Sequence, residues 1–65
     1  MKLVVNGVER ELEAVSIAAA LRALQYEGAV VATALNGEFV PARARDATPV
    51  KDGDRIEILA PRQGG

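Results

Sequence analysis

Gly64 and Gly65, which end the sequence, are the residues whose type and position best suit a chemical role. A terminal carboxylate has a pKa of about 3.3–3.7, so it is ionised at neutral pH and is a poor electrophile. It must be activated, typically as an acyl-adenylate made from ATP, before a nucleophile can attack. Two residues without a Cβ would let the backbone pass through a narrow active site and leave the last carbonyl accessible. The sequence therefore predicts that Gly65 is modified by another enzyme.

The residues before the diglycine favour a flexible, extended tail over residues 61–65. Pro61 restricts φ and would direct the chain away from the folded body, while Arg62 and Gln63 offer polar contacts to a partner. The alternative interpretation is a frayed terminus without function, or a cloning remnant. Two terminal glycines arise by chance in roughly one sequence in two hundred, which favours the functional interpretation.

Catalysis by the domain itself is disfavoured by composition. The sequence contains neither cysteine nor histidine, which removes the thiolate nucleophile, the usual general base and the commonest metal ligand. Ser16 is best explained as a helix cap, Thr33 as part of a buried strand and Thr48 as a loop residue. Asp52 and Asp54 flank a turn glycine and fall short of the roughly six to eight oxygens that calcium takes. We therefore predict a protein that is not an enzyme and holds no metal or bound cofactor.

Length and charge narrow the class of protein further. The chain has 65 residues, which is room for one small domain. Its formal net charge is −1, and aromatic residues are 3% of the total, so the basic surface and stacking aromatics of nucleic-acid binders are missing. The N-terminal apolar run is too short for a signal or membrane segment. We expect a cytoplasmic protein, monomeric on its own, without nucleic-acid or membrane partners.

A hairpin and a helix are predicted in the first half of the chain. Lys2–Val5 and Val8–Glu13 have the alternation of strands, and the dipeptide between them, Asn6-Gly7, favours a two-residue turn with positive φ at both positions. A helix should follow Ser16, which can cap its free amide groups, and Gly28 suits the left-handed position that closes it. One apolar stripe at helical spacing comprises Ile17, Ala20, Leu21 and Leu24.

The second half of the chain is predicted to be mostly strand. Ala29–Leu35 is rich in β-branched residues and nearly uncharged, as a strand covered on both faces would be. A second Asn-Gly turn leads to a short strand around Phe39-Val40, and the segment 42–50 should be irregular with a helical turn. Arg55–Ala60 alternates cleanly, with Ile56 and Ile58 on one face.

One helix with a single apolar stripe must lie on one face of the sheet. The economical architecture is an α+β protein of the β-grasp, ubiquitin-like type: a mixed sheet of four to five strands packed on one helix. In that fold the first and last strands are central neighbours. The predicted organisation is a β-grasp domain over residues 1–60 followed by the tail.

Three segments carry a resemblance to a known family: "MKLVVNGVE" at the start, "ALNGEFVP" at 34–41 and "TPVKDGDRIEILAPRQGG" at 48–65. At this spacing, in so short a chain, they resemble the ThiS-type sulfur carriers of thiamine biosynthesis. The resemblance implies that a ThiF-type enzyme uses ATP to adenylate the carboxylate of Gly65. Sulfur that comes indirectly from a cysteine desulfurase then makes a thiocarboxylate, which thiazole synthase consumes.

The resemblance also implies roles for the residues around the reactive group. Gly64 gives clearance, and Gln63 and Arg62 line the tail inside the partner. Leu59 is out of phase with the inward isoleucines, so we predict that its face of the last strand docks partners; a single exposed leucine without a role is the alternative. The basic, alanine-rich stretch 42–47 departs from the family pattern.

Three other functions remain open from the sequence. The small subunit of molybdopterin synthase shares the diglycine and the thiocarboxylate, although its approach to the glycines is usually more apolar than "LAPRQGG". A ubiquitin-like modifier would join Gly65 to a lysine by an isopeptide bond. A plain β-grasp interaction domain would leave the tail unused.

Overall fold

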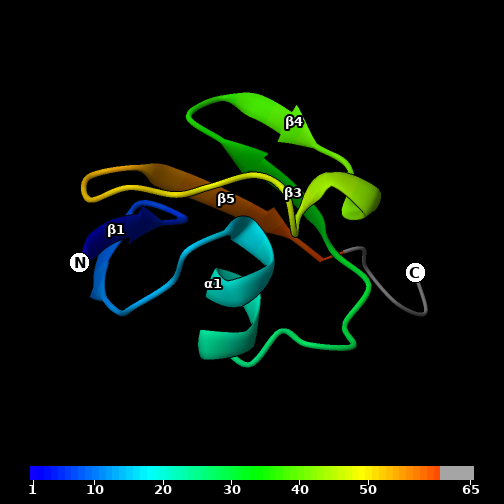
Figure 1. The fold of residues 1–65 in the computed structure, drawn as a ribbon, viewed down its shortest axis with the longest axis horizontal. Coiled ribbons are helices and arrows are strands. Elements are labelled where there is room, and N and C mark those ends of the chain that lie inside the picture. Colours follow the sequence, from blue (N-terminus) through cyan, green and yellow to red (C-terminus); the bar gives the residue numbers. More distant parts are fainter. Residues whose placement is uncertain (61–65) are drawn as a thin grey trace.

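The computed structural model describes residues 1–60 as five strands, one α-helix and a short 3-10 helix (Figure 1). In chain order these are β1 (Lys2–Val5), β2 (Val8–Glu11), α1 (Ile17–Ala23), β3 (Ala32–Leu35), β4 (Glu38–Val40), η1 (Ala42–Ala44) and β5 (Arg55–Leu59). None of the helices in this part of the chain is long and apolar enough to cross a membrane.

The five strands form one mixed sheet in the order β2-β1-β5-β3-β4. β1 and β5 run parallel at its centre, with Val5 opposite Ile56, and the other three pairs are antiparallel. The helix α1 lies against one face of this sheet (Figure 1). The predicted β-grasp architecture, with the first and last strands as neighbours, is confirmed.

Both Asn-Gly dipeptides form tight hairpin turns. Asn6 and Asn36 each have a φ of 51°, and the glycines that follow them have φ values of 83° and 87°. Positive φ at both central positions matches the right-handed twist of the flanking strands, which explains why these dipeptides join β1 to β2 and β3 to β4.

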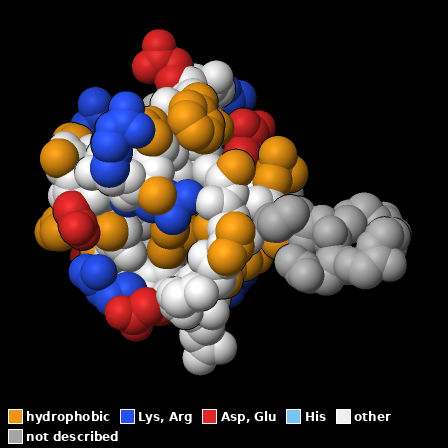
Figure 2. Space-filling view, turned by 90° about the vertical axis from the view of Figure 1, so that its right-hand side faces the viewer, with side chains coloured by type: hydrophobic (Ala, Val, Ile, Leu, Met, Phe, Trp, Pro, Cys, Tyr) orange, Lys and Arg blue, Asp and Glu red, His pale blue; other side chains and the backbone are white. Residues whose placement is uncertain are grey.

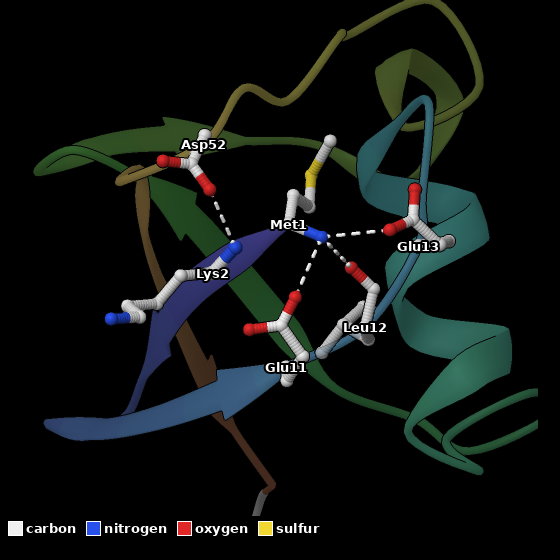
Figure 3. A network of polar contacts seen from close by, with 6 residues as sticks. All are labelled: Met1, Lys2, Glu11, Leu12, Glu13 and Asp52. Atoms are coloured by element: carbon white, nitrogen blue, oxygen red, sulfur yellow. Dashed lines mark hydrogen bonds and ion pairs between the residues drawn. The ribbon is translucent and has the colours of Figure 1, made fainter.

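The strand β2 ends at Glu11, two residues before the predicted end at Glu13. The N-terminal ammonium group of Met1 occupies the space beside this part of the chain (Figure 3). It lies 2.8 Å from a carboxylate oxygen of Glu13 and 3.0 Å from one of Glu11, and donates a hydrogen bond to the backbone oxygen of Leu12 at 3.1 Å. The Glu13 carboxylate first, and Glu11 second, raise the pKa of this amine above its ordinary value of 8.0.

The helix begins as predicted and ends earlier. The Ser16 hydroxyl accepts a hydrogen bond from the backbone amide of Ala19 at 3.1 Å, which caps the first turn. The predicted closure at Gly28 is wrong, because Gln25 takes the left-handed conformation with a φ of 68°. The amide of Tyr26 then donates to the oxygen of Leu21 at 2.8 Å, which is the hydrogen bond that spans six residues in a Schellman motif. Tyr26 packs on the core, so this contact closes the helix three residues before the glycine.

The core lies between α1 and the inner face of the sheet. Leu3 from β1, Ile17 from α1 and Ile56 from β5 are fully buried. The prediction that Ala29–Leu35 is a strand covered on both faces is wrong: β3 begins at Ala32, and Ala32 is exposed. A single helix covers only the inner face, so the outer face of β3 has no covering layer within residues 1–60.

Candidate functional site

The residues predicted for chemistry and tail contacts, Gly65, Gly64, Gln63 and Arg62, lie outside the described residues. Leu59, the predicted docking residue, ends β5 and is 71% exposed. Its exposure agrees with the prediction that it is out of phase with the inward isoleucines, and its docking role stays a prediction. The candidate site within the described chain is therefore the surface around Leu59.

The alternation of β5 turns Leu59 toward the outer face of the sheet. Ile56 and Ile58 point inward and are buried, so Glu57 and Leu59 must point outward. On the neighbouring strand β3, Ala32 lies opposite Leu59. A side chain as small as alanine leaves Leu59 open to solvent on that side.

An apolar surface surrounds Leu59, which we call the outer apolar patch. A hollow of about 340 Å³ lies where the chain enters β3 and leaves β5, and a second of about 110 Å³ lies between β3, β4 and β5. Figure 2 faces the end of the molecule where β5 finishes and shows apolar side chains gathered there among charged ones. The side chains of the patch are Val30, Ala32, Ala34, Phe39 and Leu59.

Phe39 belongs to the patch, and sequence reasoning missed it. It is 70% exposed, whereas its neighbour Val40 is buried. Only one of two successive strand residues can face the core, and the smaller valine does so here. Phe39 lies opposite Ala34, which in turn lies opposite Glu57 on the other side of β3. The signal in the sequence was the alternation of strand faces: if Val40 faces the core, the residue before it, Phe39, must face solvent.

Arg45 supports the start of β3, beside the patch. Its guanidinium group donates a hydrogen bond to the backbone oxygen of Val31 at 2.6 Å and another to the Thr33 hydroxyl at 3.1 Å. The Thr33 hydroxyl donates in turn to the oxygen of Val40 in β4. Arg45, from the basic stretch 42–47, thus links the start of β3 through Thr33 to β4.

The hydroxyl groups considered in the sequence as nucleophiles have structural partners. Ser16 accepts the amide of Ala19 as the helix cap, and Thr48 donates to the backbone oxygen of Ala44 at 2.7 Å. Asp54 accepts the amide of Lys51 within its turn. Each of these three contacts stabilises a local feature of the fold: a helix cap, the segment after the 3-10 helix and a turn.

Comparisons with known proteins identify what the chain is similar to. The model of the ThiS family matches residues 3–65. The crystal structure of a thiamine biosynthesis protein (ThiS) from Geobacter metallireducens has a TM-score of 0.84 and 39% identity, covering 100% of both chains. A solution NMR structure of a thiamine biosynthesis protein from the same organism has a TM-score of 0.81 and 38% identity, covering 100% of this chain and 88% of the other.

One curated relative is much longer than this chain. It is named thiazole synthase and comes from Paramagnetospirillum magneticum. The two sequences are 41% identical over 66 residues, which is all of this chain and 20% of the relative. The chain thus spans one fifth of the length of that protein.

Proposed function

Since the chain belongs to the ThiS family, we propose that it is a sulfur carrier protein of thiamine biosynthesis. The observation that carries this proposal is the family match, which runs from residue 3 to residue 65 and includes the diglycine. The reactive group is the carboxylate of Gly65. The protein acts as a co-substrate in the cytoplasm, and its partners carry out the catalysis.

The chemistry follows from the low reactivity of a carboxylate. A ThiF-type enzyme joins the Gly65 carboxylate to the α-phosphate of ATP and releases pyrophosphate, so that AMP becomes the leaving group. A persulfide, formed with sulfur from a cysteine desulfurase, displaces AMP from the carbonyl carbon. A thiol then attacks the inner sulfur of the acyl disulfide, forms a new disulfide with it and releases the outer sulfur as a thiocarboxylate on Gly65. Gly64 provides the clearance that these attacks need.

Thiazole synthase is the proposed acceptor of the sulfur. In Paramagnetospirillum magneticum a protein of that name includes a region 41% identical to the whole of this chain. Joining a carrier to the enzyme that uses it raises their effective concentration, which is an advantage for two components of one reaction.

The outer apolar patch is the proposed docking surface for these enzymes. Leu59 and Phe39 offer large apolar side chains that gain about 25 cal/mol for each Å² removed from water. Gly65 is six residues beyond Leu59, so a fully extended chain reaches about 20 Å from it. An enzyme bound over the patch would have its active site within that radius, where Arg62 and Gln63 can make polar contacts.

Intact mass spectrometry tests the function. After incubation with ATP, a ThiF-type enzyme and a persulfide source, the protein should gain the mass difference of sulfur replacing oxygen. Deleting Gly65, or adding one residue after it, should abolish both this gain and pyrophosphate exchange, with thermal unfolding unchanged. A variant without Gly65 that still exchanges pyrophosphate would disprove the role of the terminal carboxylate. A higher-mass conjugate would indicate a protein modifier.

A further inference from the structure

The side chain of Asn6 holds the last strand near its end. Its amide nitrogen donates to the backbone oxygen of Ile58 at 3.1 Å, and its amide oxygen accepts the backbone amide of Ile58 at 2.8 Å. The backbone amide of Asn6 donates to the oxygen of Ile56 at 2.9 Å. Although β1 turns back at Asn6, this side chain extends the pairing with β5 by one more step.

Ile58 depends on Asn6 because of the direction in which its backbone groups point. In the antiparallel pair of β3 and β5 the residues bond alternately to one neighbour and then the other. The amide and carbonyl of Ile58 face β1, where the backbone no longer runs alongside. The Asn6 amide replaces that backbone with one donor and one acceptor, and Leu59 and Ala60 follow directly in the chain.

The second Asn-Gly turn provides a matched contact at the other end of β5. The side-chain oxygen of Asn36 accepts the amide of Arg55 at 2.9 Å, and the Asn36 backbone amide donates to the oxygen of Arg55 at 2.8 Å. Asn36 and Asn6 share the same φ of 51°. One turn therefore holds the beginning of β5, and the other holds its end.

We infer that Asn6 is a positioning residue that sets where the reactive tail leaves the sheet; this inference rests on the proposed function. Gly65 is seven residues beyond Ile58, a reach of about 25 Å at full extension. If Ile58 separates from β1, the origin of the tail shifts relative to a partner bound on the outer apolar patch. The patch itself lies on β3, β4, β5 and the segment just before β3, and it does not include Asn6.

The test compares Asn6→Gly with Asn36→Gly. Glycine accepts the positive φ of both turns, so each variant removes a side-chain contact to β5 and keeps the hairpin. With a ThiF-type enzyme, we expect kcat of pyrophosphate exchange to fall roughly tenfold in Asn6→Gly, less than the roughly hundredfold that a misplacement of ~1 Å can cost. KM for the carrier should stay within about twofold, because the docking patch is intact. Asn36→Gly should leave both constants within about twofold of the wild type.

A second variant and a second readout make the outcome decisive. Asn6→Asp keeps the acceptor for the Ile58 amide and loses the donor, so its kcat should fall between those of the wild type and Asn6→Gly. Hydrogen exchange at the Ile58 amide should speed up roughly tenfold in Asn6→Gly, as expected for two lost hydrogen bonds, and not in Asn36→Gly.

Two distinct failures can be told apart. Equal kcat values in Asn6→Gly and Asn36→Gly, with the wild type active, would overturn the positioning role and leave the carrier function standing. A wild-type protein that no adenylating enzyme activates would overturn the proposed function. In that case hydrogen exchange at the Ile58 amide would still report whether Asn6 holds the end of β5.

Discussion

Leu59 and Phe39 are about equally exposed to solvent, at 71% and 70%. A single exposed apolar side chain is ordinary in a soluble protein and needs no explanation. These two border the same hollow across β3, with Ala32 and Ala34 between them. Apolar side chains gathered around one hollow are typical of a surface that another protein covers. A few residues near the centre of an interface carry most of its binding energy.

Truncation of the patch should weaken partner binding without unfolding the domain. Burying a leucine or phenylalanine side chain contributes about 1.5–3 kcal/mol, so Leu59→Ser or Phe39→Ser should raise KM for the adenylating enzyme roughly tenfold or more. Pyrophosphate exchange at varied carrier concentration measures this. Val15→Ser is the control, because Val15 is 82% exposed and lies before the helix, outside the patch. If all three variants bind alike, the patch is not the docking surface.

At the scale of elements, contacts of Met1 join the open end of the hairpin formed by β1 and β2. The backbone oxygen of Met1 accepts the amide of Leu12 at 3.0 Å, and the ammonium group of Met1 lies between the carboxylates of Glu11 and Glu13 (Figure 3). On the other side, the amide of Lys2 donates to the Asp52 carboxylate at 2.7 Å. The beginning of β1 is thereby tied to β2 and to the turn before β5.

This closure should make stability depend on pH above neutrality. The folded pKa of the amine is raised above 8.0, mainly by Glu13, so the folded protein holds that proton more tightly than the unfolded chain. The stabilisation is complete below pH 8.0 and is lost as the pH rises through the folded pKa. Glu13→Gln should reduce the fall in Tm between neutral and alkaline pH. Identical pH profiles for the variant and the wild type would contradict this.

At the scale of the whole molecule, three elements meet at one small core. Leu3, Ile17 and Ile56 have no exposed surface, and they come from β1, α1 and β5. A domain of this size buries only a modest share of its surface, so its stability should lie toward the low end of the usual range of about 5–15 kcal/mol. Each fully buried side chain therefore matters to the fold.

Ile56→Ala should bring the domain close to unfolding. Such a truncation in a packed core costs about 2–5 kcal/mol of the free energy of unfolding. The neighbouring substitution Glu57→Ala is exposed and should change that free energy by less than about 0.5 kcal/mol. Urea denaturation measures both. A loss below about 2 kcal/mol for Ile56→Ala, the lower bound of that range, would mean that the core repacks around the cavity.

Local chemistry in the sequence was enough to predict the turns, the helix start and the inward face of the last strand. Asn-Gly accepts positive φ wherever it occurs, Ser16 caps its own helix, and Ile56 and Ile58 alternate within five residues. From these the β-grasp arrangement followed, because one amphipathic helix can cover only one face of a sheet. The diglycine, and with it the proposed reactive group, was likewise readable from the sequence.

Tertiary packing decided the features that depend on residues distant in the sequence: where the helix ends, which way Phe39 faces and what the Asn6 side chain contacts. The helix ends at Ala23 and the chain turns at Gln25, where Tyr26 packs on the core. Phe39 faces solvent because Val40 takes the inward position. Asn6 was identified as a turn residue, yet its side chain bonds Ile58, 52 residues away. A local pattern specifies backbone conformation, whereas the partner of a side chain is set only when the strands come together in the sheet.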